Sequence, residues 1–545
     1  MKSRFFIVVS LTILVITMFC SAGSADLLSA LPKMAEGEAN SYLRYCARFT
    51  DARKLIEDLY PAKLFEALEP LSSSFGLESL VKMNRVVNAL SKSYIREFAL
   101  LIVMDYENTI RDGGVIMSVP DSVEALNDVA TSRDLTFYNL VLMIGGRQLL
   151  EAIKATADSF EDYKFECDND GVFFYRDNYV CIEGDVIIAF ETKETTLSVA
   201  NAVKAGVETR VTDLESPNLF SMQISRKITK TPEDIKTEIG VSYENSTWKI
   251  KTKSNLFRLM SRINILESDV IEKAQNVINT IPMVGRGEPF FSTGGNTFIN
   301  GADSIEERLM YMGDMTLTLN WATLLQMAHQ YGISKQDIGN LFAGSAAMIF
   351  GLDSKFFGLT LPLSGYIAFT GKNDAASKII GAISKSIVET GGMSESKIDG
   401  WDSVYSVAID SLLPNALIAQ RGETLLVGVM NPEDLTVKLD IKDMGLRDEK
   451  IISWLGLNFE RIWASARNAY PPLSVLLLSG AFGDISSSEK EAVQFVQHLL
   501  KTDFPIKALN IWASSLEEVD INITMNPSSK GDFWKVLFMW LGKVM

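Results

Sequence analysis

The sequence has 545 residues, of which 47% are apolar, and a formal net charge of -16 at pH 7. A chain of this length exceeds the usual size of a single hydrophobic core, so two domains are expected. An acidic surface repels phosphate backbones, and the sequence has no basic tract to offset this, so nucleic-acid binding is not expected.

The N-terminus has the order of a secretory signal peptide. Two cations precede an uncharged, mainly apolar run, residues 5–19, and small residues follow at 21–25. This order predicts export, with cleavage after Ala25 or Ala22. Residues 1–25 are therefore assigned to a signal peptide, and the expected location is the periplasm or the extracellular space.

Two alternatives give the chain a membrane role at its N-terminus. An uncleaved anchor ranks second to soluble export, because the apolar run is somewhat shorter than the roughly 20 residues that span a bilayer. Lipidation of Cys20 ranks lower, because a lipoprotein signal has small residues before its cysteine and Met18 and Phe19 are bulky. The apolar C-terminus, residues 533–545, is too short to span, and we expect it to pack on its own sheet rather than on a membrane.

Three segments of the first half of the chain have counterparts, in the same order, in the second half. The pairs are 113–129 with 364–383, 178–206 with 415–435, and 248–263 with 519–541. The first pair predicts a strand and a helix start. The second predicts a strand, a two-residue turn, a strand and a capped helix start. The third predicts an alternating strand followed by an apolar helix. Such runs also arise by chance in α+β proteins, which is the alternative interpretation.

The expected fold is therefore α+β, with two related domains from a tandem duplication, each a mainly antiparallel sheet covered by helices. A stretch rich in Gly, Pro, Ser and Asn at 281–304 is the predicted linker. It separates a first domain, 26–280, from a second domain, 305–545. Unequal spacings between the matched segments place a net insertion in the second domain, within 443–510.

The strands of the second pair differ from those of the third in their patterning. VIIAF at 186–190 and TLLVGV at 424–429 are apolar throughout, so both of their faces should be covered. Gly184 with Asp185, and Gly422 with its successor, are the predicted hairpin turns. The strands within the third pair alternate apolar with polar residues, which predicts a sheet with one solvated face.

The cysteines give no firm disulfide. Cys46, Cys167 and Cys181 follow the signal peptide, and Cys167 and Cys181 are the only pair close in sequence. In a simple meander these two would lie on strands separated by a third, beyond the roughly 7 Å between Cα atoms that a disulfide bridges. Three buried thiols are the favoured interpretation, and a Cys167–Cys181 disulfide with one free thiol is the alternative.

Catalytic and metal-binding motifs are few. The two histidines, His329 and His498, lie in predicted helices with no partner for a catalytic triad or a zinc site. SESK at 394–397 and SSEK at 487–490 match a penicillin-binding pattern only formally, and both are interpreted as polar loops or helix starts. GYIAFTGK at 365–372 lacks P-loop spacing and is interpreted as a strand and a helix cap.

Residues 168–171, Asp-Asn-Asp-Gly, lack the remainder of a calcium loop and are interpreted as a hairpin turn. The sequence therefore identifies no catalytic residue, metal site or cofactor site. Export, duplication and the lack of catalytic motifs favour a non-enzymatic binding or scaffolding protein of the cell envelope, whose partner is an envelope protein or an apolar small molecule. The alternatives are a carrier of an apolar ligand such as lipid, and a carboxylate-based hydrolase of envelope polymers.

Overall fold

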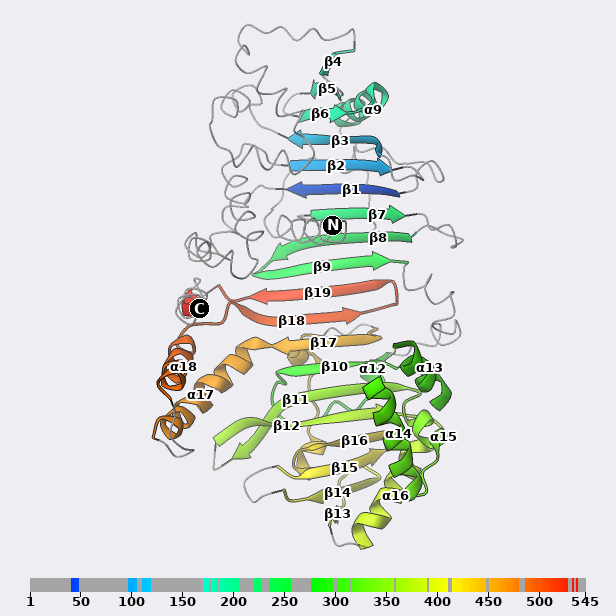
Figure 1. Ribbon diagram of the computed structural model, residues 1–545, viewed down its shortest axis with the longest axis vertical. Coiled ribbons are helices and arrows are strands. Elements are labelled where there is room, and N and C mark those ends of the chain that lie inside the picture. Colours follow the sequence, from blue (N-terminus) through cyan, green and yellow to red (C-terminus); the bar gives the residue numbers. More distant parts are fainter. Residues whose placement is uncertain are drawn as a thin grey trace. The chain divides into compact units, whose positions relative to one another are not determined.

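The computed structural model describes residues 41–48, 97–104, 110–118, 170–175, 178–183, 186–205, 220–226, 235–255, 276–297, 299, 301–312, 315–356, 359–389, 392–409, 414–446, 450–479, 486–527, 532–533 and 536–537. These residues form a mixed α/β structure with extensive antiparallel sheet and eight α-helices. The chain divides into two compact units (Figure 1). Unit 1 comprises residues 1–259 and 525–545, and unit 2 comprises residues 260–524.

Unit 1 is built on antiparallel strands, of which the structure describes nine. They are β1 (Ser41–Arg48), β2 (Glu97–Met104), β3 (Ile110–Ser118), β4 (Val172–Tyr175), β5 (Asn178–Glu183), β6 (Val186–Phe190), β7 (Phe220–Arg226), β8 (Ile235–Glu244) and β9 (Thr247–Ser254). Hydrogen-bonded pairs give the order β4-β5-β6-β3-β2-β1-β7-β8-β9. Helix α9 (Lys193–Lys204) follows β6 and packs on β5 and β6.

Strand β6 is buried on both faces, as its uninterrupted apolar sequence predicts. Ile188 and Phe190 have no exposed surface and belong to one core cluster with Val199 and Ala200 of α9. Ile187, which points to the opposite face, is also buried. Helix α9 therefore covers one face of this hairpin.

The strands of unit 2 are also antiparallel. They are β10 (Phe291–Asn296), β11 (Ser345–Phe356), β12 (Leu359–Thr370), β13 (Ser394–Ser396), β14 (Ser403–Val407), β15 (Ala416–Arg421), β16 (Thr424–Val429), β17 (Ser453–Asn458) and β18 (Ile506–Ala513). The order is β13-β14-β15-β16-β12-β11-β10-β17-β18. A further strand, β19 (Glu518–Met525), follows β18 in the chain.

The described helices of unit 2 are α12 (Val277–Thr280), α13 (Ala302–Met312), α14 (Met315–Gln330), α15 (Lys335–Leu341), α16 (Ala375–Glu389), α17 (Phe459–Leu478) and α18 (Ser487–Leu499), with the 3-10 helices η4 (Pro432–Thr436) and η5 (Ile441–Met444). Some of them pack on the two faces of the sheet. One core cluster joins Ile418 and Leu425 of the sheet to α14, α15 and α16. The other joins Ala419 and Leu426, on the opposite face, to α12, η4 and η5.

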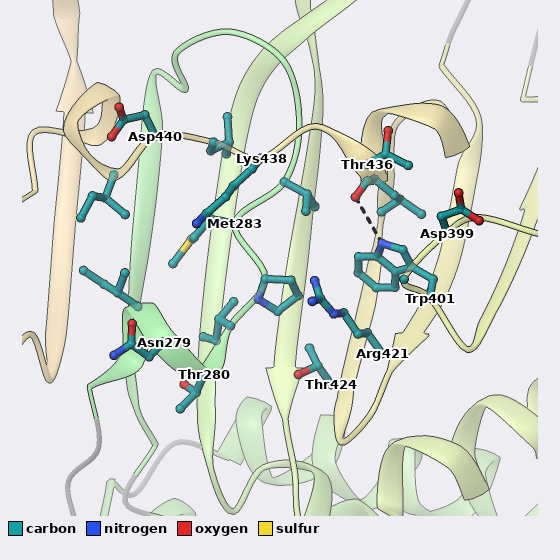
Figure 2. A pocket seen from close by; sticks show the side chains of 18 residues that line it. Asn279, Thr280, Met283, Asp399, Trp401, Arg421, Thr424, Thr436, Lys438 and Asp440 are labelled. Carbon is teal, nitrogen blue, oxygen red and sulfur yellow. Dashed lines mark hydrogen bonds between the residues drawn. The ribbon is translucent and has the colours of Figure 1, made fainter. Parts of the chain in front are cut away.

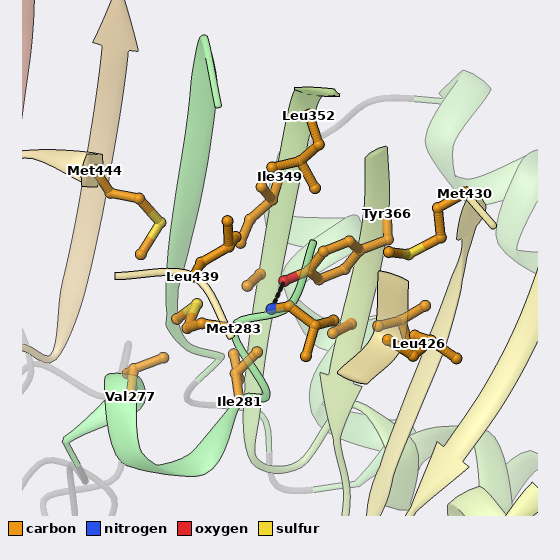
Figure 3. Packing of buried hydrophobic residues seen from close by; sticks show 14 of the residues in the cluster. Val277, Ile281, Met283, Ile349, Leu352, Tyr366, Leu426, Met430, Leu439 and Met444 are labelled. Carbon is orange, nitrogen blue, oxygen red and sulfur yellow. Dashed lines mark hydrogen bonds between the residues drawn. The ribbon is translucent and has the colours of Figure 1, made fainter. Parts of the chain in front are cut away.

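Tyr366 lies at the centre of the second of these clusters (Figure 3). Its side chain is fully buried, and its hydroxyl oxygen accepts a hydrogen bond from the backbone N of Val284 at 3.0 Å. The same hydroxyl donates to the backbone O of Pro282 at 3.1 Å. Tyr366 therefore holds the covering segment 281–284 against the sheet.

The strands of the two units follow one common order. Eight strands of each unit have matching neighbours, and all their pairings are antiparallel. The matching orders are β14-β15-β16-β12-β11-β10-β17-β18 in unit 2 and β4-β5-β6-β3-β2-β1-β7-β8 in unit 1. In unit 2, β13 pairs beyond β14 as an addition.

Matching positions carry an exchanged pair of residues. In unit 1, Gly114 of β3 pairs with Phe190 of β6, whereas in unit 2 Tyr366 of β12 pairs with Gly428 of β16. A Cβ atom on Gly114 would lie 2.2 Å from the Phe190 ring, and one on Gly428 would lie 2.6 Å from Cβ of Tyr366. Each pair thus accommodates one aromatic side chain and requires glycine opposite it.

The segment 281–304, the predicted linker, contributes instead to the interior of unit 2. It supplies β10, which lies between β11 and β17, and it buries Ile281 and Met283. Gly294 of β10 makes room for the indole of Trp454 on β17, since a Cβ there would lie 2.2 Å from the ring. Gly294, which resembles a linker glycine in sequence, therefore serves close packing.

The predicted insertion region contains the helical pair α17 and α18. It connects β17 to β18 through residues 459–505, whereas the matching strands β7 and β8 are connected through 227–234. The base of the pair is fixed by Arg467, whose guanidinium donates to the backbone O of Leu500 and of Thr502 at 2.6 Å each.

The predicted hairpins are present, with one difference in burial. Glu183 pairs with Val186 and Arg421 pairs with Thr424 at the two turns, although Gly184 and Asp185 themselves lie outside the described residues. Val427 of β16 is 45% exposed, so TLLVGV is covered on both faces only in its first half. The alternating strands β9 and β19 are mostly half-buried along their whole length, without a clean solvated face.

Cys46 and Cys181 are buried, and Cys167 lies outside the described residues. So do residues 1–25 and most of 533–545. Within the described part of the chain, no helix combines the length and apolar character needed to cross a membrane.

Candidate functional site

An open groove in unit 2, on the face of the sheet covered by α12, η4 and η5, is the candidate site (Figure 2). We call it the unit 2 groove, and its volume is about 1280 Å³. Its lining comes from four parts of the chain: residues 278–284, residues 399–401, Arg421 with Thr424, and residues 435–441. All four are brought together by the pairing of β12, β14, β15 and β16.

One wall is the segment from α12 to Val284. It is held against the segment after η4 by backbone hydrogen bonds, from Leu439 N to Met283 O at 3.0 Å and from Gly285 N to Val437 O at 2.8 Å. Val277 at the start of this wall is fully buried in the core. The wall is therefore anchored on its inner side and presents Asn279 and Thr280 to the groove (Figure 2).

The opposite wall contains Trp401, whose indole N donates to the backbone O of Leu435 at 3.2 Å. This bond joins the turn before β14 to the end of η4. Beside η4, the guanidinium of Arg286 donates to the buried carboxylate of Asp434, and this interaction raises the pKa of Arg286 further above its ordinary value. The indole is thereby fixed in orientation, with one edge bound and the ring half-buried on the core.

The end of the groove is formed by the β15–β16 hairpin. Gly422 has a φ of 56°, in the left-handed region, and its backbone N donates to the carboxylate of Asp402 at 2.6 Å. The hydroxyls of Thr424 and Thr370 lie 2.9 Å apart. A tight turn therefore sets Arg421 and Thr424 side by side at the groove.

The charged side chains that line the groove form no ion pairs with one another. Its lining carries Arg421, Lys438, Asp399 and Asp440. Among the residues that the structure describes, none of the four has an ion-pair partner within 4.0 Å, although Asp440 accepts a hydrogen bond from the backbone N of Lys442. An indole face, two cations and several hydroxyl and amide groups can bind a ligand of mixed apolar and anionic character.

No family model, curated protein or solved structure matches this chain. The groove is therefore interpreted from its own residues.

None of the motifs weighed in the sequence forms part of the groove. His329 lies near the end of α14 and His498 near the end of α18, in helices as predicted. SESK at 394–397 begins as the short strand β13 rather than a loop or helix start, and SSEK at 487–490 is the first turn of α18. In the described part of the chain, no three His, Cys, Asp or Glu side chains are grouped so that they could hold a metal ion.

GYIAFTGK at 365–372 is the end of β12 and the approach to α16, as predicted. Within Asp-Asn-Asp-Gly, Asp170 and Gly171 form a turn with Gly171 at a φ of 76°, and Asp170 pairs with Lys193 at 2.8 Å. Asp168 and Asn169 lie outside the described residues.

The residues that line the groove were not identified from the sequence. Trp401 and Lys438 lie in irregular segments without a motif, and only the fold brings them together. The one available signal is Arg421, which stands next to the predicted Gly422 turn and therefore had to lie at the end of a hairpin.

Proposed function

We propose that the protein is an exported, non-enzymatic binding protein of the cell envelope, and that the unit 2 groove is its ligand site. The supporting observation is the lining, where Trp401 is fixed beside Arg421 and Lys438, two cations without an ion-pair partner in the described part of the chain. Charged groups at a concave surface that lack a partner within the protein are available to a ligand. The ligand expected for them is an anionic segment of another envelope protein.

The position of the carboxylates favours binding over hydrolysis. Glycoside hydrolysis uses two carboxyl groups that face each other across roughly 5 to 10 Å. Asp399 and Asp440 lie at opposite ends of the groove in Figure 2. A carboxylate-based hydrolase of envelope polymers is therefore the lower-ranked function for this site.

The apolar strands give limited support to a lipid carrier. The carrier hypothesis needs open space beside VIIAF or TLLVGV, yet Ile188 and Phe190 contact the side chains of α9. On β16, Leu426 packs against the cluster that contains Tyr366. These contacts favour a structural role for both strands.

We further propose that the two units are copies produced by tandem duplication. The support is the common order of eight strands, together with the exchange of aromatic and glycine at the Gly114–Phe190 and Tyr366–Gly428 pairs. A chance resemblance of α+β elements would not preserve both the order and the register. The export proposal rests on the charge, apolar and small-residue order of residues 1–25.

Site-directed photo-crosslinking in the producing cells tests the binding function. A photoreactive residue replaces Thr436, an exposed groove threonine that donates to Glu433 O. The control position is Thr323, an exposed threonine of α14 that donates to Leu319 O. We expect a covalent adduct from position 436 only.

The yield of the adduct should fall strongly when Arg421→Ala and Lys438→Ala are introduced together, because both positive charges are then removed. Thermal unfolding of this variant checks that the fold is kept. The same adducts from both positions, or none from position 436, would overturn the proposed function.

A further inference from the structure

The β15–β16 hairpin of unit 2 matches the β5–β6 hairpin of unit 1 position by position. Each is closed by one pair, Arg421 with Thr424 and Glu183 with Val186. Next to the hairpin, Val404 pairs with Ala419 in unit 2 as Val172 pairs with Cys181 in unit 1. The register therefore makes Arg421 the counterpart of Glu183.

In unit 1, helix α9 occupies one face of this hairpin. It starts with Thr192 as N-cap and spans 12 residues. Its buried Thr196 donates to Tyr179 O of β5 at 3.1 Å, and Val199 packs into the core. At its end, Lys204 forms an ion pair with Glu183 at 2.7 Å, which raises the pKa of Lys204.

In unit 2, the chain after β16 follows the course of the first turn of α9 and then departs from it. After β16 it forms only η4, whose Leu435 is buried in the cluster that contains Leu426. At Val437 it turns away to pair with residues 283–285. Beyond η4, this face of the hairpin carries no α-helix from the described residues that would correspond to the second half of α9.

The unit 2 groove lies in the place left open. It runs from Leu435 and Thr436, where η4 ends, to Arg421 and Thr424, where the hairpin turns (Figure 2). These are the counterparts of the regions that α9 joins in unit 1, where it leads away from β6 and ends at Glu183. The groove therefore follows the path of the second half of α9 but lies above Trp401 and Leu435, which pack over the buried Ala419 and Leu426 of the hairpin.

We propose that the unit 2 groove binds an α-helix of a partner protein in the place that α9 occupies in unit 1, with an acidic last turn against Arg421. This inference rests on the proposed binding function and specifies its ligand. The mode of binding is that of an amphipathic helix in a groove, with small apolar residues on the inner face as in α9.

The charge of the partner follows from the exchange of Glu183 for Arg421. The C-terminal end of a helix carries partial negative charge from its free carbonyl groups. Beside Glu183 this end requires a cation, and α9 provides Lys204. Beside Arg421 the same end is attracted directly, and a carboxylate in the last turn adds to the attraction.

The experiment uses α9 itself as the probe. A fluorescein-labelled peptide of residues 192–205 is made with a hydrocarbon link between the exposed positions 194 and 198, because a short helix is marginal in water. A second peptide carries Lys204→Glu. Fluorescence anisotropy with the whole protein is expected to give about 1.5- to fivefold tighter binding for the acidic peptide, the range for a single exposed charge pair.

The preference is expected to reverse with Arg421→Glu protein. Lys385→Glu, which makes the same charge change at an exposed position of α16, should leave it unaltered. A Val199→Pro version of the acidic peptide, which cannot remain helical, should bind at least tenfold more weakly. Equal binding of the basic and acidic peptides, or of the helical and proline-containing peptides, would overturn the inference.

The two experiments distinguish failure of the helical ligand from failure of the binding function. Adducts at position 436 without any peptide binding would reject the helical ligand and leave the binding function standing. Absence of both adducts and peptide binding would reject the helical ligand together with the groove as a binding site.

Discussion

At the scale of single residues, the hydroxyl of Tyr366 joins the buried centre of unit 2 to the segment that covers it. It bonds to Val284 N and to Pro282 O. Tyr366→Phe leaves both backbone groups without this partner in the interior, so we expect a loss of about 1–3 kcal/mol in the free energy of unfolding. Urea unfolding measures the loss. Tyr405→Phe, at a half-buried tyrosine, should cost less than about 0.5 kcal/mol, and equal losses would contradict the prediction.

The same tyrosine predicts a dependence on alkaline pH. Burial raises the pKa of Tyr366 well above its ordinary value of 10.0. The folded state therefore keeps this proton where the unfolded state has lost it, so the stabilisation is complete below pH 10 and is lost as the pH rises above it. The slope is about 1.4 kcal/mol per pH unit. The stability difference between wild type and Tyr366→Phe should shrink above pH 10, and a constant difference would argue against this.

Gly428 offers a test of the aromatic–glycine pairing. A Cβ at this position would lie 2.4 Å from the backbone O of Gly365 and 2.6 Å from Cβ of Tyr366. Neither atom can move away freely, so Gly428→Ala should destabilise the protein by about 1–3 kcal/mol. At Gly381 of α16, by contrast, an added Cβ would have no neighbour within 4 Å. Gly381→Ala should therefore stabilise by about 0.5–1 kcal/mol, and calorimetry should show melting temperatures shifted in opposite directions.

At the scale of elements, α18 depends on its N-terminal cap, because none of its residues is buried. The hydroxyl of Ser486 accepts from Glu489 N at 3.3 Å, and the carboxylate of Glu489 accepts from Ser486 N at 2.6 Å. Ser486→Ala should make amide hydrogen exchange in α18 about fivefold faster, as expected for loss of a cap. Exchange in α15, which has its own capping box at Ser334, serves as the control.

Acid should loosen α18 in the same way. The hydrogen bonds with Ser486 lower the pKa of Glu489 below 4.5. A lowered pKa means that the cap stabilises the helix fully above pH 4.5 and less as the pH falls through the folded-state pKa. Exchange in α18 should therefore accelerate in acid in wild type, and an equal acceleration in a Glu489→Gln variant would contradict this cause.

The elements themselves could be predicted from the sequence where turns and periodicity agree. The β15–β16 hairpin follows from Gly422 between two apolar runs, and α18 agrees with the helix predicted around His498 and with the interpretation of SSEK at 487–490 as a helix start. The prediction differed at 281–304 because glycine has two uses. In a linker it gives freedom, whereas at Gly294 it makes room for Trp454, and composition cannot distinguish these cases.

The groove could not be predicted, since its lining joins residues 278–284 to three segments that lie more than a hundred residues later in the chain. Trp401 is positioned by a bond to Leu435 O, and Lys438 by pairing with Val284. Both interactions involve irregular segments and backbone atoms. They therefore produce no characteristic spacing of residue types in the sequence. What the sequence did contain was the matched pair of hairpins, from which the groove is recognised by comparison.

At the scale of the whole molecule, the export proposal makes a direct prediction about the mature chain. Intact mass spectrometry of protein from the periplasmic or culture fraction should give an N-terminus at Asp26 or Gly23, because these follow the predicted cleavage sites. Cys20→Ser should leave this unchanged, since lipidation is not required. A chain that begins at Met1 in the membrane fraction would support the uncleaved anchor instead.

The aromatic–glycine exchange also bears on how the chain reaches its native state. A protein with two similar units can misassemble when strands of one unit pair with those of the other. Were β6 to take the place of β16, Phe190 would meet Tyr366, and two rings would compete for one space. Were β16 instead to take the place of β6, Gly428 would pair with Gly114 and leave a void. The aromatic–glycine pairs therefore disfavour, by volume, the pairing of a strand from one unit with strands of the other.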